Sequence, residues 1–201
     1  MPRLKHTDEN GNSMRHSFLV LLLMLAGCRP SPAQQVAVDG RFADWDSLAV
    51  LATDPSGDAG ASGVDFTRLQ ASDDAAWLYL SFDTGVELLL QDGNGIRLAI
   101  DTDNDPRTGQ AQRGIGAELV WDFAQRQGTV RLGGTVQVRH DDLRLVPAPS
   151  MTSTRFELAI RKNSSFNGRP LFPSSTIRFL LIDAAGDVLP DADGGVTYNF
   201  T

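Results

Sequence analysis

The 201-residue chain has a single cysteine, Cys28, and therefore cannot form an internal disulfide bond. Histidine, methionine and lysine are almost as rare. After that cysteine each of them occurs once, as His140, Met151 and Lys162. Zinc sites built on two or more histidines, or on two or more cysteines, are thereby excluded from residues 28–201. In a serine–histidine catalytic pair, the histidine that acts as the general base would have to be His140. Motifs of serine hydrolases, zinc peptidases and phosphate-binding loops are also missing.

Long apolar runs are equally scarce. The longest, FLVLLLMLA at residues 18–26, has nine residues, whereas a membrane-spanning helix needs about twenty. A run of this length behind a short basic head, which includes Arg15, is typical of the core of a signal peptide. Because the residues before Met14 are polar and without pattern, we expect translation to start at Met14.

Residues 25–28 (LAGC) resemble the lipobox of bacterial lipoproteins. The resemblance implies that residues 1–27 are a signal peptide, that Cys28 is acylated and that the mature chain is anchored in a lipid bilayer. Arg29 follows the cysteine where inner-membrane lipoproteins carry aspartate, which favours the outer membrane of the cell envelope. The Pro-, Ser- and Gln-rich residues 28–35 are expected to form a tether.

Basic residues are fewer than acidic ones. The chain has 18 Lys and Arg against 25 Asp and Glu, a formal net charge of −7. Since the leader contributes three basic and two acidic residues, the mature chain carries −8. An acidic domain is not attracted to phosphate backbones, so nucleic acid is excluded as an expected partner.

Apolar and polar residues alternate in several short segments, which predicts β-strands. These segments are residues 77–83, 96–100, 118–123, 156–161 and 177–182. Two shorter runs flank Gly133-Gly134 and predict a hairpin. Clusters of Gly and Asp separate the strands, and no segment shows a helical period. We therefore predict an all-β fold, with residues 36–201 forming a single two-sheet antiparallel β-sandwich of jelly-roll-like type.

Four motifs occur in a characteristic order. They are VDGRFADW at residues 38–45, DFTRL at 65–69 leading into WLYL at 77–80, DTDNDPRTG at 101–109, and GIGAE at 114–118. This order resembles the family 9 carbohydrate-binding-module-like (DOMON-like) β-sandwich domains. The resemblance implies a sandwich with bound calcium and, in the carbohydrate-binding members, sugar held by exposed aromatic side chains.

Asp101, Asp103 and Asp105 alternate directly after a predicted strand, so their carboxylates can converge inside one turn. Calcium takes about six to eight oxygen ligands. Three carboxylates without a cation would repel one another. The loop is not an EF-hand, because Pro106 stands at the sixth position and Gln112 at the twelfth. We expect a structural calcium site here; the alternative is a solvated acidic turn that binds no metal.

The family resemblance adds two further expected calcium ligands, Glu118 and Asp65. For the ligand-binding surface, Trp77 and Tyr79 alternate with two leucines. If the leucines face the core, the two aromatic rings face solvent or a ligand, and sugar rings stack well on such surfaces. Trp45 is expected to fill part of the core instead.

Together these features predict a membrane-anchored, non-catalytic, calcium-stabilised domain that binds a polysaccharide or oligosaccharide. The alternative is an assembly lipoprotein that docks an envelope protein. An enzyme could use residues 140–142 (HDD), which we expect to be a solvated strand end, or a pair of the other carboxylates as a glycosidase does. A haem-binding domain, by analogy with haem-binding relatives of the same broad group, would use Met151 and Lys162 as axial ligands.

Overall fold

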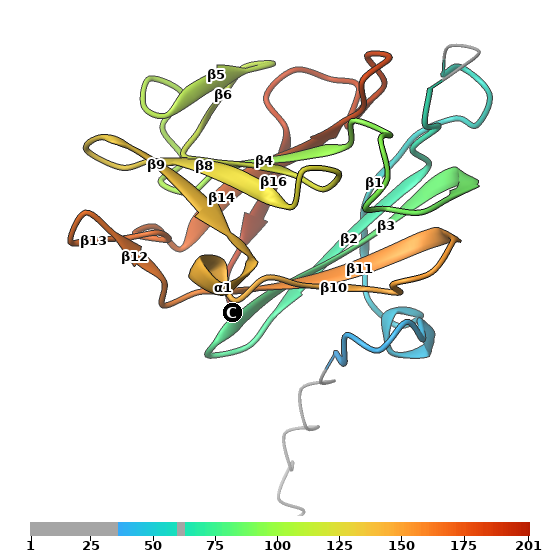
Figure 1. The fold of residues 1–201 in the computed structure, drawn as a ribbon, viewed down its shortest axis with the longest axis horizontal. Helices are drawn as coiled ribbons and strands as arrows, with labels where there is room; N and C mark the ends of the chain where they lie inside the picture. The colour runs from blue at the N-terminus through green and yellow to red at the C-terminus, as the bar shows by residue number, and fades with distance from the viewer. Residues whose placement is uncertain (1–35, 60–62) are drawn as a thin grey trace, which may run out of the picture. The chain divides into compact units, whose positions relative to one another are not determined.

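Antiparallel strands are the main regular structure of the described residues. The computed structural model describes residues 36–59 and 63–201 (Figure 1). These residues belong to a compact unit that runs from Gln34 to Thr201. The predicted signal peptide, the acylation site Cys28 and the tether lie outside the described residues. Within the described residues, no helix is long and apolar enough to cross a membrane.

Two antiparallel sheets form the β-sandwich that the alternation predicted. The first sheet contains β1 (Val50–Thr53), β2 (Arg68–Asp73), β3 (Trp77–Leu88), β10 (Val146–Ala148) and β11 (Ser153–Arg161). The second contains β4 (Arg97–Asp101), β7 (Leu119–Asp122), β8 (Gln127–Arg131), β9 (Thr135–Arg139), β14 (Thr176–Ile182), β15 (Val188–Leu189) and β16 (Val196–Asn199). Their orders are β1-β2-β3-β11-β10 and β15-β14-β4-β7-β8-β9, and β16 also pairs with β14.

Short elements complete the fold. Two hairpins are formed by β5 (Gln110–Gln112) with β6 (Ile115–Ala117) and by β12 (Ser165–Phe166) with β13 (Arg169–Pro170). The helical turns are η1 (Ala43–Trp45) and α1 (His140–Leu143).

The main core lies between the two sheets. Leu78, Leu80 and Phe82 of β3 alternate with outward-facing residues and pack against Leu98 and Trp121 of the second sheet. Each such side chain contributes about 1.5–3 kcal/mol when it is fully buried. The period of two in the sequence therefore accounts directly for which side of each strand forms the core.

The outer face of the second sheet is also covered. Ile115 and Ala117 of β6 form a small apolar cluster with Ala99, Leu180 and Val188. The C-terminal part of β14 is consequently buried on both faces, which accounts for its consecutive apolar residues Phe179, Leu180 and Leu181. This packing places the residues next to β6 against the loop that follows β4.

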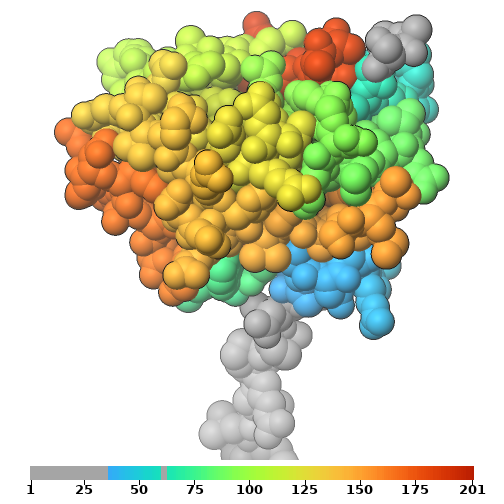
Figure 2. Space-filling view, viewed as in Figure 1, coloured from blue at the N-terminus to red at the C-terminus, as the bar shows by residue number. Residues whose placement is uncertain are grey.

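The outer face of the first sheet is covered by residues 36–48. Val36 and Trp45 pack there against Tyr79 and Ala159. Figure 2 shows this segment, in blue, against the orange surface that includes β10 and β11. Gly40 lies so close to this region that a Cβ atom at its position would be 3.3 Å from Pro149 Cβ. The N-terminal segment is thus an integral layer of the fold.

Candidate functional site

The acidic loop after β4 forms a group of three carboxylates. Ligand oxygens of Asp101, Asp103 and Glu118 all lie within 4.8 Å of one another. Asp101 ends β4 and Glu118 directly follows β6, and their exposed fractions are 0% and 1%. Among residues 36–59 and 63–201, no lysine or arginine forms an ion pair with any of the three. Negative charge is therefore gathered here without a counter-charge from the part of the chain that the structure describes.

The surroundings of the two buried carboxylates favour their neutral forms. Burial is the main cause that raises the pKa of Asp101 and of Glu118, and the charge of Asp103 raises both further. Hydrogen bonds oppose this shift: Asp101 accepts from the N–H of Gly116, and Glu118 accepts from the N–H of Thr102 at 2.8 Å. A bound cation would favour the charged forms in the same way.

The Thr108 hydroxyl is surrounded by acceptors. Its Oγ1 atom lies 2.7 Å from Glu118 Oε1, 3.1 and 3.0 Å from the two Asp103 carboxylate oxygens, and 3.1 Å from the main-chain oxygen of Asp105. A hydroxyl has one proton, so it can donate to only one of these oxygens at a time. The remaining acceptor oxygens face one another, and no positive group of the described residues lies between them. Carboxylate, hydroxyl and carbonyl oxygens are the ligands that calcium takes, and the residues therefore fit this ion.

Two glycines allow the loop to lie directly on β6. A Cβ atom on Gly116 would be 2.3 Å from the main-chain oxygen of Thr108 and 2.5 Å from that of Asp105. Gly109 has a φ of +64°, and a Cβ atom there would be 2.7 Å from Glu118 Oε1. Side chains at these positions would push the carboxylates apart, so the close approach depends on glycine.

Two predicted ligands have their carboxylates in other places. Arg107 Nε and Nη2 donate to the two oxygens of Asp105 at 2.8 and 2.7 Å, which lowers the pKa of Asp105 to about 2. Only the main-chain oxygen of Asp105 faces the Thr108 hydroxyl. Asp65 accepts the N–H of Gly57 at 2.8 Å and so belongs to the connection between β1 and β2. The structure brings neither carboxylate into the group.

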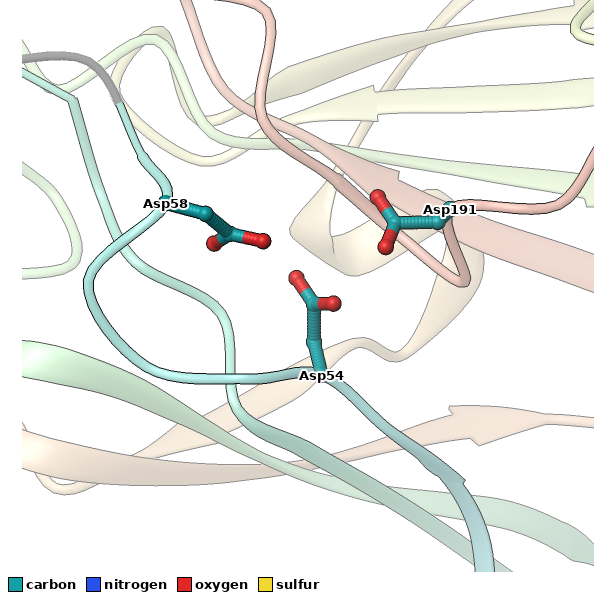
Figure 3. A group of neighbouring side chains, drawn as sticks. All are labelled: Asp54, Asp58 and Asp191. Carbon is teal, nitrogen blue, oxygen red and sulfur yellow. The ribbon is translucent and has the colours of Figure 1, made fainter.

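A second group of carboxylates was not recognised in the sequence. Asp54, Asp58 and Asp191 also present ligand oxygens within 4.8 Å of one another (Figure 3). Asp54 and Asp58 lie in one predicted turn, but Asp191 belongs to a distant one. No local pattern links the two turns, so only the tertiary structure reveals the group.

The expected ligand face is largely closed. The leucines beside Tyr79 do point into the core, but the opposite face is covered by Trp45 and Val36, and Tyr79 is only 7% exposed. Its hydroxyl donates to Asp74 Oδ2 at 2.9 Å. The prediction that Tyr79 faces solvent or a ligand is therefore wrong, because a separate segment packs on that face. Trp45 is buried, as predicted.

Trp77 remains partly exposed at the edge of the same face. The guanidinium carbon of Arg161 lies 5.7 Å from the centroid of its ring. Arg161 Nε donates to Asn163 Oδ1 at 2.7 Å, and both of these polar side chains are exposed. The indole is thus bordered by the Arg161 guanidinium, which is a hydrogen-bond donor.

The remaining sequence candidates are structural. His140 is not a solvated strand end: it begins α1 and packs edge-on against Trp121, with ring centroids 4.7 Å apart. Met151 lies two residues before the nine-residue β11 and Lys162 directly follows it, and the strand between them spans about 25–30 Å at a rise of about 3.3 Å per residue. Lys162 also pairs with Asp73. The two side chains cannot bind one haem iron.

Comparisons of the chain with protein-family models, with curated proteins and with solved structures found no match.

Proposed function

We propose that this chain is a non-catalytic binding protein of the bacterial cell envelope, lipid-anchored through Cys28, stabilised by calcium and specific for carbohydrate. The observation that carries the proposal is the crowding of oxygens around Thr108 Oγ1, beside the buried carboxylates of Asp101 and Glu118. When bound, calcium would supply the positive charge that none of the described residues places there. Asp101, Asp103 and Glu118 would hold it through carboxylate oxygens, and the loop would remain fixed against β6.

Removal of calcium is expected to destabilise the protein. An ion present at 100 times its Kd stabilises the folded state by about 2.7 kcal/mol. For a domain of this size, that corresponds to a decrease of about 5–10 °C in Tm when a chelator is added. Differential scanning calorimetry with and without chelator measures the shift. An identical melting curve in excess chelator would contradict the calcium site.

Two variants test whether the calcium-dependent change in Tm arises at the group of Asp101, Asp103 and Glu118. Asp103→Asn removes one carboxylate of the group and is expected to reduce the calcium-dependent increase in Tm. Asp92→Asn removes the same charge from an exposed turn outside the group and is the matched control. Equal calcium dependence in these two variants and the unmodified chain would argue against Asp103 as a ligand.

Trp77 supports carbohydrate as the ligand class. Its partly exposed indole offers a flat apolar surface, the Arg161 guanidinium carbon lies 5.7 Å from the ring centroid, and the exposed Asn163 side chain accepts a hydrogen bond from Arg161 Nε. Binding sites for small polar ligands combine such an apolar surface with a few orienting polar groups. A pyranose ring would stack on the indole and accept hydrogen bonds from the neighbouring side chains.

Affinity electrophoresis of the calcium-loaded protein through gels that contain a panel of polysaccharides tests this assignment. At least one glycan is expected to retard the protein, and Trp77→Ala is expected to abolish the retardation. Tyr79→Phe is the control, because Tyr79 is buried and its variant should be retarded normally. Retardation that persists in Trp77→Ala would place the sugar elsewhere.

A protein-docking lipoprotein is the second candidate, favoured by exposed apolar side chains at one end of the first sheet. Met151 is 69% exposed and Val86 is 42% exposed. Their neighbours Thr152 and Glu87 share a hydrogen bond of 2.9 Å, and these two residues line a hollow of about 540 Å³. Exposed apolar area beside a hollow suits a partner's side chain. Failure of every polysaccharide to retard the protein would favour this candidate.

A further inference from the structure

The group of Asp54, Asp58 and Asp191 connects the edges of the two sheets. Asp54 directly follows β1, the terminal strand of the first sheet, and Asp191 lies two residues after β15, the terminal strand of the second. Figure 3 shows the three carboxylates directed toward a common space. Any ligand held between them would join two segments that are distant in the sequence.

Asp54 is the buried member of the group. Its exposed fraction is 8%, and its buried Oδ2 atom has no hydrogen-bond partner among the described residues. A buried carboxylate oxygen normally accepts hydrogen bonds or binds a metal ion. The orientation of Asp54 toward Asp58 and Asp191 leaves an oxygen ligand available inside the group.

The charges around Asp54 are all negative. Burial raises the pKa of Asp54 to about 7, and the nearby Asp191 carboxylate, followed by the charges of Asp58 and Asp187, acts in the same direction. Arg113 donates to the main-chain oxygen of Asp191 and pairs with Asp193 at 3.0 Å. Its guanidinium is therefore engaged outside the three converging carboxylates.

Neighbouring carboxylates have a different role, because they hold the main chain. Asp183 accepts the N–H of Val64 and Asp187 accepts the N–H of Phe66, both at 2.8 Å. These bonds attach the segment before β2 to the turn between β14 and β15. The main chain around the three carboxylates is thus held in place by hydrogen bonds between a loop of the first sheet and a loop of the second.

We propose that Asp54, Asp58 and Asp191 form a second divalent-cation site, which takes calcium and clips the edge of the first sheet to the edge of the second. All three proposed ligands are carboxylates, which bind metal through oxygen. They come from two separate loops. This combination suits calcium, which accepts variable geometry, better than magnesium, which requires a near-ideal octahedron. The site is separate from the calcium site at Asp101, Asp103 and Glu118.

Isothermal titration calorimetry of the full chain in detergent, freed of metal and titrated with calcium chloride, counts the sites. The unmodified chain is expected to bind two calcium ions. Asp58→Asn should retain one ion and weaken the other at least tenfold, and because Asp58 is exposed the variant should fold. Asp103→Asn should lose the other ion. Asp193→Asn, which removes the same charge from the loop that contains Asp191, should still bind two.

Melting experiments distinguish a cation ligand from a merely structural aspartate. In chelator, Asp58→Asn is expected to melt at the same temperature as the unmodified chain or higher, because one of three repelling carboxylates has been removed. In calcium it is expected to melt lower. A lower Tm under both conditions would overturn the proposed role of Asp58.

The stoichiometry separates this inference from the calcium site of the proposed function. One ion per chain, lost in Asp103→Asn and retained in both Asp58→Asn and Asp191→Asn, would overturn the second site and leave the first intact. One ion lost only in Asp58→Asn and Asp191→Asn would do the opposite. Unchanged binding of two ions in both of these variants would also overturn the second site.

Discussion

Glu157→Gln is expected to destabilise the fold by about 2–4 kcal/mol, because it leaves buried donors facing each other. Glu157 is fully buried on the outer face of β11. Its Oε1 accepts the N–H groups of Asp39 and Gly40 at 2.8 and 2.6 Å, and its Oε2 accepts the indole N–H of Trp45 at 2.8 Å. An amide has one oxygen, so its NH₂ group must face at least one of these donors.

The expected consequence is local as well as global. Residues 36–48 are attached to the first sheet through this carboxylate and through the apolar contacts of Trp45, so Tyr79 should become accessible when the attachment weakens. Urea unfolding followed by tryptophan fluorescence measures the loss of stability, and amide hydrogen exchange of residues 36–48 measures the local release.

An exposed glutamate provides the control. Glu87→Gln makes the same chemical change on the surface, where substitutions usually alter stability by less than about 0.5 kcal/mol. If Glu157→Gln unfolds at the same urea concentration as Glu87→Gln, the buried carboxylate does not hold the N-terminal segment.

The second large effect is expected for Gly116→Ala. The new Cβ atom would meet the main-chain oxygens of Thr108 and Asp105 at 2.3 and 2.5 Å. Because both atoms belong to the backbone, the whole loop must move, and overpacking of this kind costs about 1–3 kcal/mol. The displaced loop should also weaken calcium binding at the Asp101 group at least tenfold, which calorimetric titration can measure.

Gly93→Ala is the matched control, since no heavy atom lies within 4 Å of a Cβ atom at that position. It should keep normal calcium affinity and nearly normal stability. Normal calcium affinity in Gly116→Ala would mean that the close approach of the loop to β6 does not shape the ion site.

Glu157→Gln alters contacts between segments that are distant in the sequence. Contacts of this kind could not be predicted from the sequence. The all-β sandwich was predictable because a strand's period of two is a local property. Leu78, Leu80 and Trp121 face the core as their alternation indicated. Asp101 and Asp103 were also recognisable as partners, because they follow one strand within one short loop.

Only the tertiary structure decided what covers each face and which loops meet. Tyr79 lies on the predicted face, yet residues 36–48 close it, and alternation contains no information about a covering segment. Asp105 alternates with its neighbours, but its carboxylate pairs with Arg107 instead. Asp54 and Asp191 meet because the terminal strands of two sheets come together. The sequence by itself thus determined the strands that alternate clearly and their inward faces, since these follow from local periodicity, whereas β1, β2 and β10 were not among the predicted segments. The covered faces and the second acidic group follow from long-range packing, which no single segment encodes.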